Sequence, residues 1–165
     1  LNDRVQQLSR LFKHEFIFRT DALFDEIFDD TVRDMVKDGE IETRPGQLQA
    51  SEGIKRQRLI RYTTMLQTFF ESYLLALRGA EIVLDGPIQK KDWYKRTLAL
   101  GQQMYLAGEI ERRESLSKLK LETALKALQD YQLVQLNGDT LERGEGVESV
   151  EDLHALEPKL TGFLR

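Results

Sequence analysis

The stretch EGIKRQRLIRYTTMLQTFFESYLLALR, residues 52–78, decides the fold. Apolar side chains recur in it every three or four residues, which is the spacing of one face of an α-helix. The residues on this face are Leu59, Tyr62, Leu66, Phe69, Tyr73 and Leu77, and Ile60, Phe70 and Leu74 widen it. At about 1.5 Å per residue such a helix would span about 40 Å. We therefore predict a long central helix within residues 51–84, which ends near Gly79 unless residues 80–84 extend it.

The segment before this helix, residues 1–50, is predicted to form a small winged-helix-like unit. In chain order its elements are a helix (Asn2–Phe12), a strand (Glu15–Arg19), a helix that ends at Gly39, a strand (Glu40–Arg44) and a turn (Pro45–Gly46). Thr20 has the side chain of a good N-cap for the second helix. That helix turns one apolar face inward, with Phe24, Ile27, Phe28 and Met35.

The segment after the central helix, residues 85–145, is predicted to form a second helical unit with a β-hairpin wing. Its elements are a turn (Asp85–Pro87), a helix (Lys91–Leu106), a helix with Ser117 as N-cap and Leu121, Ala124, Leu125 and Leu128 inside, and strands at Leu133–Leu136 and Thr140–Glu142. Asn137–Gly138 is a strong signal for a two-residue hairpin turn. Residues 146–165 are predicted to be a loose acidic tail with a weak final helix. The expected fold class is mainly α, with two winged-helix-like units around a long central helix.

Composition excludes several classes of protein. The chain has 165 residues, with 24 basic against 28 acidic residues and a net charge of −4, which disfavours strong non-specific attraction to nucleic acid or anionic lipid and leaves only local patches to act. It has no cysteine, which excludes disulfides and thiolate metal sites. No apolar run approaches the roughly 20 residues that cross a bilayer. Because the chain opens on Leu1 in a helical pattern, we expect a fragment of a larger protein.

Few residues are candidates for chemistry. His14 and His154 are the only histidines, and neither has a partner at metal-ligand spacing, so no metal and no cofactor are expected. The carboxylate pairs Asp25–Glu26 and Asp29–Asp30 lie opposite the apolar face of their helix, where solvated charge is expected. No catalytic residue is therefore assigned.

The strongest binding candidate is basic and lies at the start of the central helix: Lys55, Arg56, Arg58 and Arg61. These residues predict contact with anionic lipid headgroups or another phosphate-bearing partner. The alternative is docking against the acidic helix before them, or simple solvation. A docking face for another domain is expected around Ile60, Phe70 and Leu74.

Three stretches resemble, in this order, the C-terminal region of membrane-associated glycerol-3-phosphate acyltransferases: Phe69–Leu77, Gly101–Ile110 and Glu114–Leu125. Glu15–Phe18 and Gly39–Ile41 are similar to the beginning of that region. The resemblance implies a parent enzyme that moves a fatty acyl group from coenzyme A or acyl carrier protein to glycerol 3-phosphate.

The family's catalytic motif is His-x-x-x-x-Asp, with the histidine as general base. Five positions after His14 stands Arg19, and five after His154 stands Lys159, so no catalytic residue of the family can be assigned here. The resemblance implies a non-catalytic C-terminal domain that supports the N-terminal catalytic domain of the same polypeptide, at the cytoplasmic side of a membrane and without a transmembrane segment.

The alternative hypothesis is a stand-alone winged-helix regulator that binds nucleic acid. Its recognition helix, Leu119–Tyr131, would offer Lys118, Lys120 and Lys126 but no arginine, and its wing is acidic at the tip. Because direct base readout favours Arg, Asn and Gln on a positive surface, nucleic acid is the less favoured partner.

Overall fold

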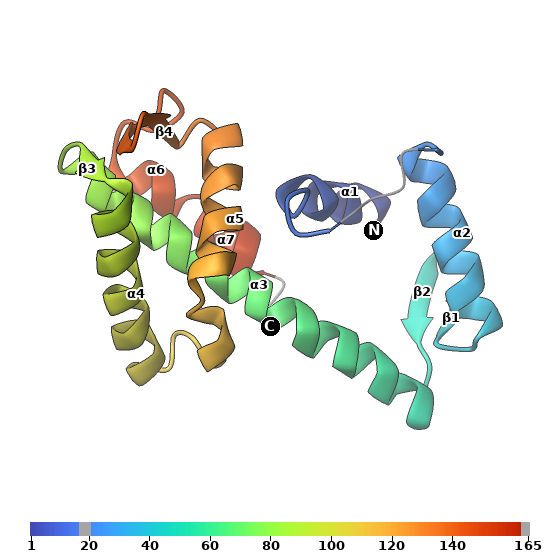
Figure 1. The fold of residues 1–165 in the computed structure, drawn as a ribbon. Coiled ribbons are helices and arrows are strands. Elements are labelled where there is room, and N and C mark those ends of the chain that lie inside the picture. Colours follow the sequence, from blue (N-terminus) through green and yellow to red (C-terminus); the bar gives the residue numbers. More distant parts are fainter. Residues whose placement is uncertain (17–20, 163–165) are drawn as a thin grey trace. The chain divides into compact units, whose positions relative to one another are not determined.

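The computed structural model describes residues 1–16 and 21–162, apart from the side chain of Lys159 (Figure 1). Its elements are α1 (Asn2–Leu11), α2 (Phe24–Lys37), β1 (Ile41–Arg44), β2 (Gln47–Ala50), α3 (Ile54–Leu84), β3 (Ile88–Gln89), α4 (Lys90–Leu106), the 3-10 helix η1 (Arg113–Ser115), α5 (Lys118–Asp130), β4 (Val134–Asn137), β5 (Thr140–Arg143), α6 (Val150–His154) and α7 (Glu157–Thr161). The predicted mainly α fold class is confirmed. The chain forms two compact units, Leu1–Leu66 and Gln67–Arg165. The four-part division predicted at residues 50, 84 and 145 stays a prediction.

The Leu1–Leu66 unit contains α1, α2 and a hairpin. Strands β1 and β2 pair antiparallel from Ile41 with Ala50 to Arg44 with Gln47, and Gly46 in the turn has a φ of +75°. The predicted Pro45–Gly46 turn is thus confirmed, whereas the returning strand β2 was not predicted. The prediction that a helix starts after Thr20 is wrong, because residues 21–22 form a bend and α2 begins at Phe24.

The start of α2 is held by a side chain of its own first turn. The Leu23 N–H donates to Glu26 Oε2 over 3.1 Å, which satisfies one of the N–H groups that a helix start leaves without a partner. Thr20 itself lies outside the described residues, as does most of the predicted strand Glu15–Arg19; Glu15 and Phe16 are in a turn and a bend.

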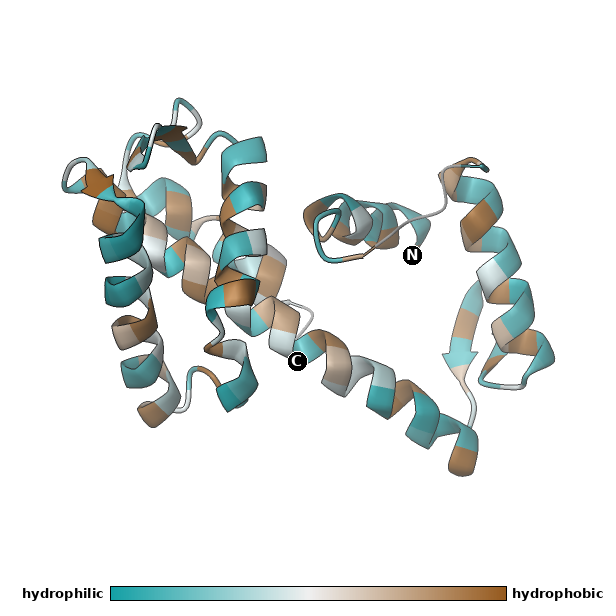
Figure 2. Cartoon of the chain, in the orientation of Figure 1, coloured by the Kyte–Doolittle hydropathy of each residue, from teal (hydrophilic) through white to brown (hydrophobic). Residues whose placement is uncertain are grey.

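Helix α2 has the amphipathic pattern that the sequence predicts. Figure 2 shows apolar and polar residues alternating along this helix. Its apolar residues Phe24, Ile27, Phe28 and Met35 are only half-buried, and the rings of Phe24 and Phe28 stack with 6.2 Å between centroids. Of the described residues of this unit only Phe12, Glu40 and Ser51 are buried, so its core is small.

Helix α3 continues through Gly79 to Leu84, so the extension over residues 80–84 is confirmed and the helix does not stop at Gly79. Gly79 is needed for close packing instead. A Cβ at this position would lie 2.6 Å from Thr97 Oγ1 of α4, and the Gly79 carbonyl accepts a 2.8 Å hydrogen bond from the buried Trp93 Nε1. The predicted docking face is corrected as well: Ile60 is exposed, but Phe70 and Leu74 are buried.

The Gln67–Arg165 unit holds most of the core. Its three-stranded sheet has the order β3-β5-β4, and the predicted hairpin and helix are confirmed at β4–β5 and α5. The two-residue loop is Gly138–Asp139, one position later than predicted, because Asn137 pairs with Thr140. Fully buried side chains include Leu75, Trp93, Leu121, Leu125, Leu141 and Leu153. The winged-helix-like assignment of this unit stays a prediction.

The predicted loose tail is wrong for the described residues. Val147 and Leu153 are buried, and the Gly144 and Gly146 N–H groups donate to the carbonyls of Leu133 and Gln132 over 3.0 and 2.8 Å. The segment is ordered because it closes the sheet end of the core, which its acidic composition did not reveal. No helix in the described ranges is long and apolar enough to cross a membrane.

Candidate functional site

The predicted basic residues lie in the first two turns of α3, in the Leu1–Leu66 unit, and all four are exposed. Two of them, Lys55 and Arg58, contact other residues of the same unit. The Lys55 amino group lies against Gly39 at the end of α2, and Arg58 Nη1 is 3.6 Å from Oε1 of the buried Glu40. A cation near a helix C-terminus is favoured by the helix dipole. Lys55 and Arg58 thus have an internal electrostatic role.

The other two, Arg56 and Arg61, have no ion-pair partner within residues 1–16 and 21–162. Each lies one helical turn before an exposed apolar side chain, Ile60 and Met65 respectively. Ile54 is also exposed, with 79% of its surface accessible. This end of α3 therefore offers free cations next to exposed apolar groups, and its assignment as a binding site stays a prediction.

The acidic pairs of α2 lie on an exposed face of the helix, as predicted for solvated charges. Asp25, Glu26, Asp29 and Asp30 are all exposed. Asp25 accepts from Asn2, Glu26 holds the start of its own helix, and Asp30 pairs with Arg33 at 2.8 Å. Each of these contacts lies within the Leu1–Leu66 unit, which favours the structural interpretation of these carboxylates.

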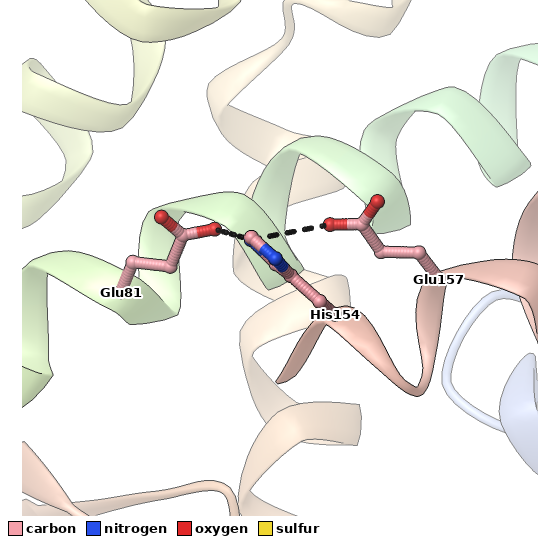
Figure 3. A group of neighbouring side chains, drawn as sticks. All are labelled: Glu81, His154 and Glu157. Carbon is pink, nitrogen blue, oxygen red and sulfur yellow. Dashed lines mark hydrogen bonds and ion pairs between the residues drawn. The ribbon is translucent and has the colours of Figure 1, made fainter. Parts of the chain in front are cut away.

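A histidine does meet acidic partners in the Gln67–Arg165 unit (Figure 3). The i,i+3 spacing of His154 and Glu157 was overlooked in the sequence, and the spacing gave no sign of Glu81. His154 Nε2, at the end of α6, lies 3.0 Å from Glu81 Oε1 of α3 and 3.9 Å from Glu157 Oε1 of α7. One ligand atom from each residue falls within 4.8 Å of the others, which is close enough to hold a metal ion. The prediction that the chain binds no metal is not tested by this geometry.

The positively charged guanidinium of Arg78 also contacts these side chains. Arg78 Nη1 is 3.0 Å from His154 Nε2, and the Arg78 guanidinium pairs with Glu157 through contacts of 2.7 and 2.9 Å. His154 Nε2 accepts from Arg78 in one tautomer and donates to Glu81 when it carries the proton. We interpret the four side chains as an ion-pair network that fastens α6 and α7 to α3.

Within the described part of the chain, the most completely hydrogen-bonded carboxylate is Glu71 of α3, which is 2% exposed. Its Oε1 accepts from Gln67 Nε2 at 2.9 Å and the Glu111 N–H at 3.1 Å; its Oε2 accepts from the Arg112 N–H at 3.0 Å and Ser115 Oγ at 2.7 Å. A buried carboxylate is tolerated where such donors replace water. Glu71 thereby holds the connection between α4 and α5 against α3.

Sequence reasoning missed both groups because, apart from the i,i+3 pair His154 and Glu157, their partners are distant in the chain. Glu81 and His154 are 73 positions apart, and Glu71 and Arg112 are 41. One signal pointed to Glu71: it is the single charged residue in the apolar run Phe69–Leu77. A charge inside a buried run requires partners, although it does not identify them.

The lysines proposed for nucleic-acid recognition are in part engaged within their own unit. Lys118 Nζ lies 3.7 Å from Glu122, and Lys120 Nζ lies 5.0 Å from the centre of the Phe69 ring. These contacts give no support to the nucleic-acid alternative, which stays a prediction.

Comparison with known proteins identifies the family. Residues 1–137 match the family described as the glycerol-3-phosphate acyltransferase C-terminal region. No curated protein sequence matches the chain. The matched residues include both compact units up to the hairpin, as well as Glu71 and the segment that it holds. The chain therefore belongs to the glycerol-3-phosphate acyltransferase C-terminal region family.

Proposed function

We propose that the chain is the non-catalytic C-terminal domain of a glycerol-3-phosphate acyltransferase and that it supports the catalytic domain of the same polypeptide. The observation that carries this proposal is the family match over residues 1–137.

The exposed start of α3 is our candidate for the contact with the catalytic domain. Ile54, Ile60 and Met65 are 79%, 55% and 67% exposed. Several exposed large apolar side chains on one helix make it a candidate interaction site. The half-buried apolar residues of α2 in the same unit also leave apolar area for a partner.

Deletion of this region from the full-length enzyme tests the supporting role. We expect acyl transfer to be lost, because the catalytic domain loses a contact surface. A milder variant, Ile54→Ser with Ile60→Ser, should lower the activity while the circular dichroism of the isolated chain stays unchanged. Leu106→Ser, at an exposed leucine of α4, is the matched control. Full activity after deletion would refute the proposal, as would a parent sequence without an acyltransferase domain.

Peripheral membrane contact is a second candidate function, favoured by the free cations Arg56 and Arg61 beside Ile60 and Met65. Basic residues near apolar ones are typical of helices that bind at an anionic membrane surface. Reversal of both charges, Arg56→Glu with Arg61→Glu, should weaken co-sedimentation with anionic vesicles. Arg10→Glu with Lys37→Glu reverses two exposed charges elsewhere in the unit. Equal binding by both double variants would assign the basic residues to a structural role.

A further inference from the structure

A groove of about 750 Å³ lies on the Gln67–Arg165 unit between α4 and α5. This volume is in the range of sites that bind small molecules. Its lining residues are Gln89, Lys90, Lys91, Tyr94, Lys95, Leu98, Lys118, Glu122 and Asp139. The hairpin closes one end, where the Lys90 N–H donates to the Asp139 carbonyl over 2.8 Å.

The groove is positively charged, although the chain as a whole is acidic. It contains four lysines against two carboxylates, a formal balance of +2. Lys118 pairs with Glu122 at 3.7 Å. Among the residues that the structure describes, none of the carboxylates lies within ion-pair distance of Lys90, Lys91 or Lys95. Lys90, Lys91 and Lys118 also lie in the first turns of their helices, where the dipole disfavours cations and favours an anion.

Tyr94 is the second indication of a ligand. Only 6% of its surface is exposed, and its hydroxyl has no hydrogen-bond partner in the described part of the chain. Lys90 Nζ and Lys118 Nζ lie 5.9 and 5.5 Å from the centre of its ring. Burial, and then the charge of Glu122, raise the pKa of Tyr94 to about 12, so the hydroxyl keeps its proton at neutral pH. A buried hydroxyl without an acceptor is costly, and a bound anion would supply that acceptor.

We propose that this groove binds a phosphate monoester, with Lys90, Lys91, Lys95 and Lys118 neutralising its charge and the Tyr94 hydroxyl donating to one of its oxygens. A phosphate monoester carries close to two negative charges at pH 7, which matches the balance of the groove. The cations are all lysines, which bind phosphate groups as point charges. The proposal does not depend on the proposed function.

The test is a titration of the full chain with inorganic phosphate, followed by amide NMR at pH 7.5. Lys95→Gln removes one cation of the groove, and Arg96→Gln removes the adjacent cation of α4, which does not line it. Tyr94→Phe removes only the hydroxyl. Since that hydroxyl has no protein partner, this variant should keep the stability of the parent chain. We expect saturable binding that is unchanged in Arg96→Gln and about tenfold weaker in Lys95→Gln and Tyr94→Phe.

Two further arms identify the source of the phosphate group. A soluble phosphate monoester tests a metabolite, and vesicles with phosphatidic acid test a lipid headgroup, with phosphatidylglycerol vesicles as the diester control. The vesicle arm uses the Arg56→Glu, Arg61→Glu chain so that the start of α3 does not contribute. Binding in either monoester arm that depends on Lys95 supports the proposal. Absence of saturation, equal weakening in Lys95→Gln and Arg96→Gln, or equal binding to the diester vesicles would overturn it.

Discussion

Each compact unit buries one glutamate, and the two carboxylates differ in the number and length of their polar contacts. Glu71, in Gln67–Arg165, accepts four hydrogen bonds of 2.7–3.1 Å, two of them from backbone N–H groups. Glu40, in Leu1–Leu66, has the Tyr62 hydroxyl at 3.4 Å and Arg58 Nη1 at 3.6 Å. Both residues are nearly covered, at 2% and 5% exposure. The charge of Glu71 is thus fully satisfied inside its unit, whereas that of Glu40 has long contacts to two exposed side chains.

The difference extends to the apolar residues around each glutamate. Glu71 is followed by a continuous buried run along α3, whereas the half of α3 in the other unit exposes Ile54, Ile60 and Met65. A unit with few buried side chains has little stabilisation of its own, because burial of apolar area is the main favourable term in folding. We infer that Gln67–Arg165 is the stable part of the chain and that Leu1–Leu66 gains most from a partner.

The largest predicted effect separates the two glutamates directly. Glu71→Ala removes the acceptor of four donors, including the buried Ser115 hydroxyl, and should lower the free energy of unfolding by about 3–5 kcal/mol. Glu40→Ala should cost about 1 kcal/mol, because Arg58 and Tyr62 can turn to water. Urea unfolding followed by circular dichroism measures both. Similar losses in the two variants would refute the distinction between the units.

A smaller effect is expected from tight packing in the stable unit. Gly79→Ala should gain about 1 kcal/mol of helix propensity. It must also place a methyl group 2.6–2.7 Å from two atoms of the buried, β-branched Thr97, so we expect a net loss of about 1–2 kcal/mol. Thr97→Ala in the same chain should restore part of this stability. If the double variant is no more stable than Gly79→Ala, the contact is not the cause.

The smallest predicted effect concerns the acid stability of the same unit. Hydrogen bonds from the Glu148 and Ser149 N–H groups and the Ser149 hydroxyl hold the pKa of Asp152 below its usual range. The contribution of Asp152 is therefore complete above the ordinary carboxyl range, near pH 4, and is lost as the pH falls through the lowered pKa. Asp152→Ala should lower the unfolding midpoint at pH 7 by less than Gly79→Ala does.

The pH dependence gives this prediction its control. The difference between the parent chain and Asp152→Ala should shrink as the pH is lowered below 4, because Asp152 is then protonated in the parent as well. Glu151→Ala removes a neighbouring exposed acid of α6 without those hydrogen bonds. A difference that stays constant from pH 7 to pH 2 would show that the capping charge does not contribute.

Local patterns predicted most of the elements. The apolar spacing around Leu66 and Phe69 marked α3, and the glycines of Pro45–Gly46 and Asn137–Gly138 marked both hairpins, because turns depend on a few adjacent residues. The same reasoning left two possibilities open at Gly79. A glycine in a helical pattern indicates either a stop or a close contact, and only the position of Thr97 decides between them.

The candidate sites were less predictable, because they depend on the tertiary structure. The basic residues Lys55, Arg56, Arg58 and Arg61 were found from the sequence, but the pairing of Arg58 with Glu40 and the contact of Lys55 with Gly39 follow from the tertiary structure. The lysines of the groove come from two helices and were not recognised as one group. Phe70 and Leu74 were expected to be exposed, because a wide apolar face does not reveal how many sides of a helix are covered.

The boundary between the two units, after Leu66, falls inside α3 and not in a loop. A truncated chain that begins at Gln67 would therefore start in mid-helix, and its first four N–H groups would lose their carbonyl acceptors. The loss would fall on the N–H groups of residues 67–70, directly before the buried Glu71. Serine or aspartate at position 66 would return one acceptor as an N-cap. Separate preparation of the stable unit thus requires a redesigned helix start, which the intact chain avoids by continuing the helix.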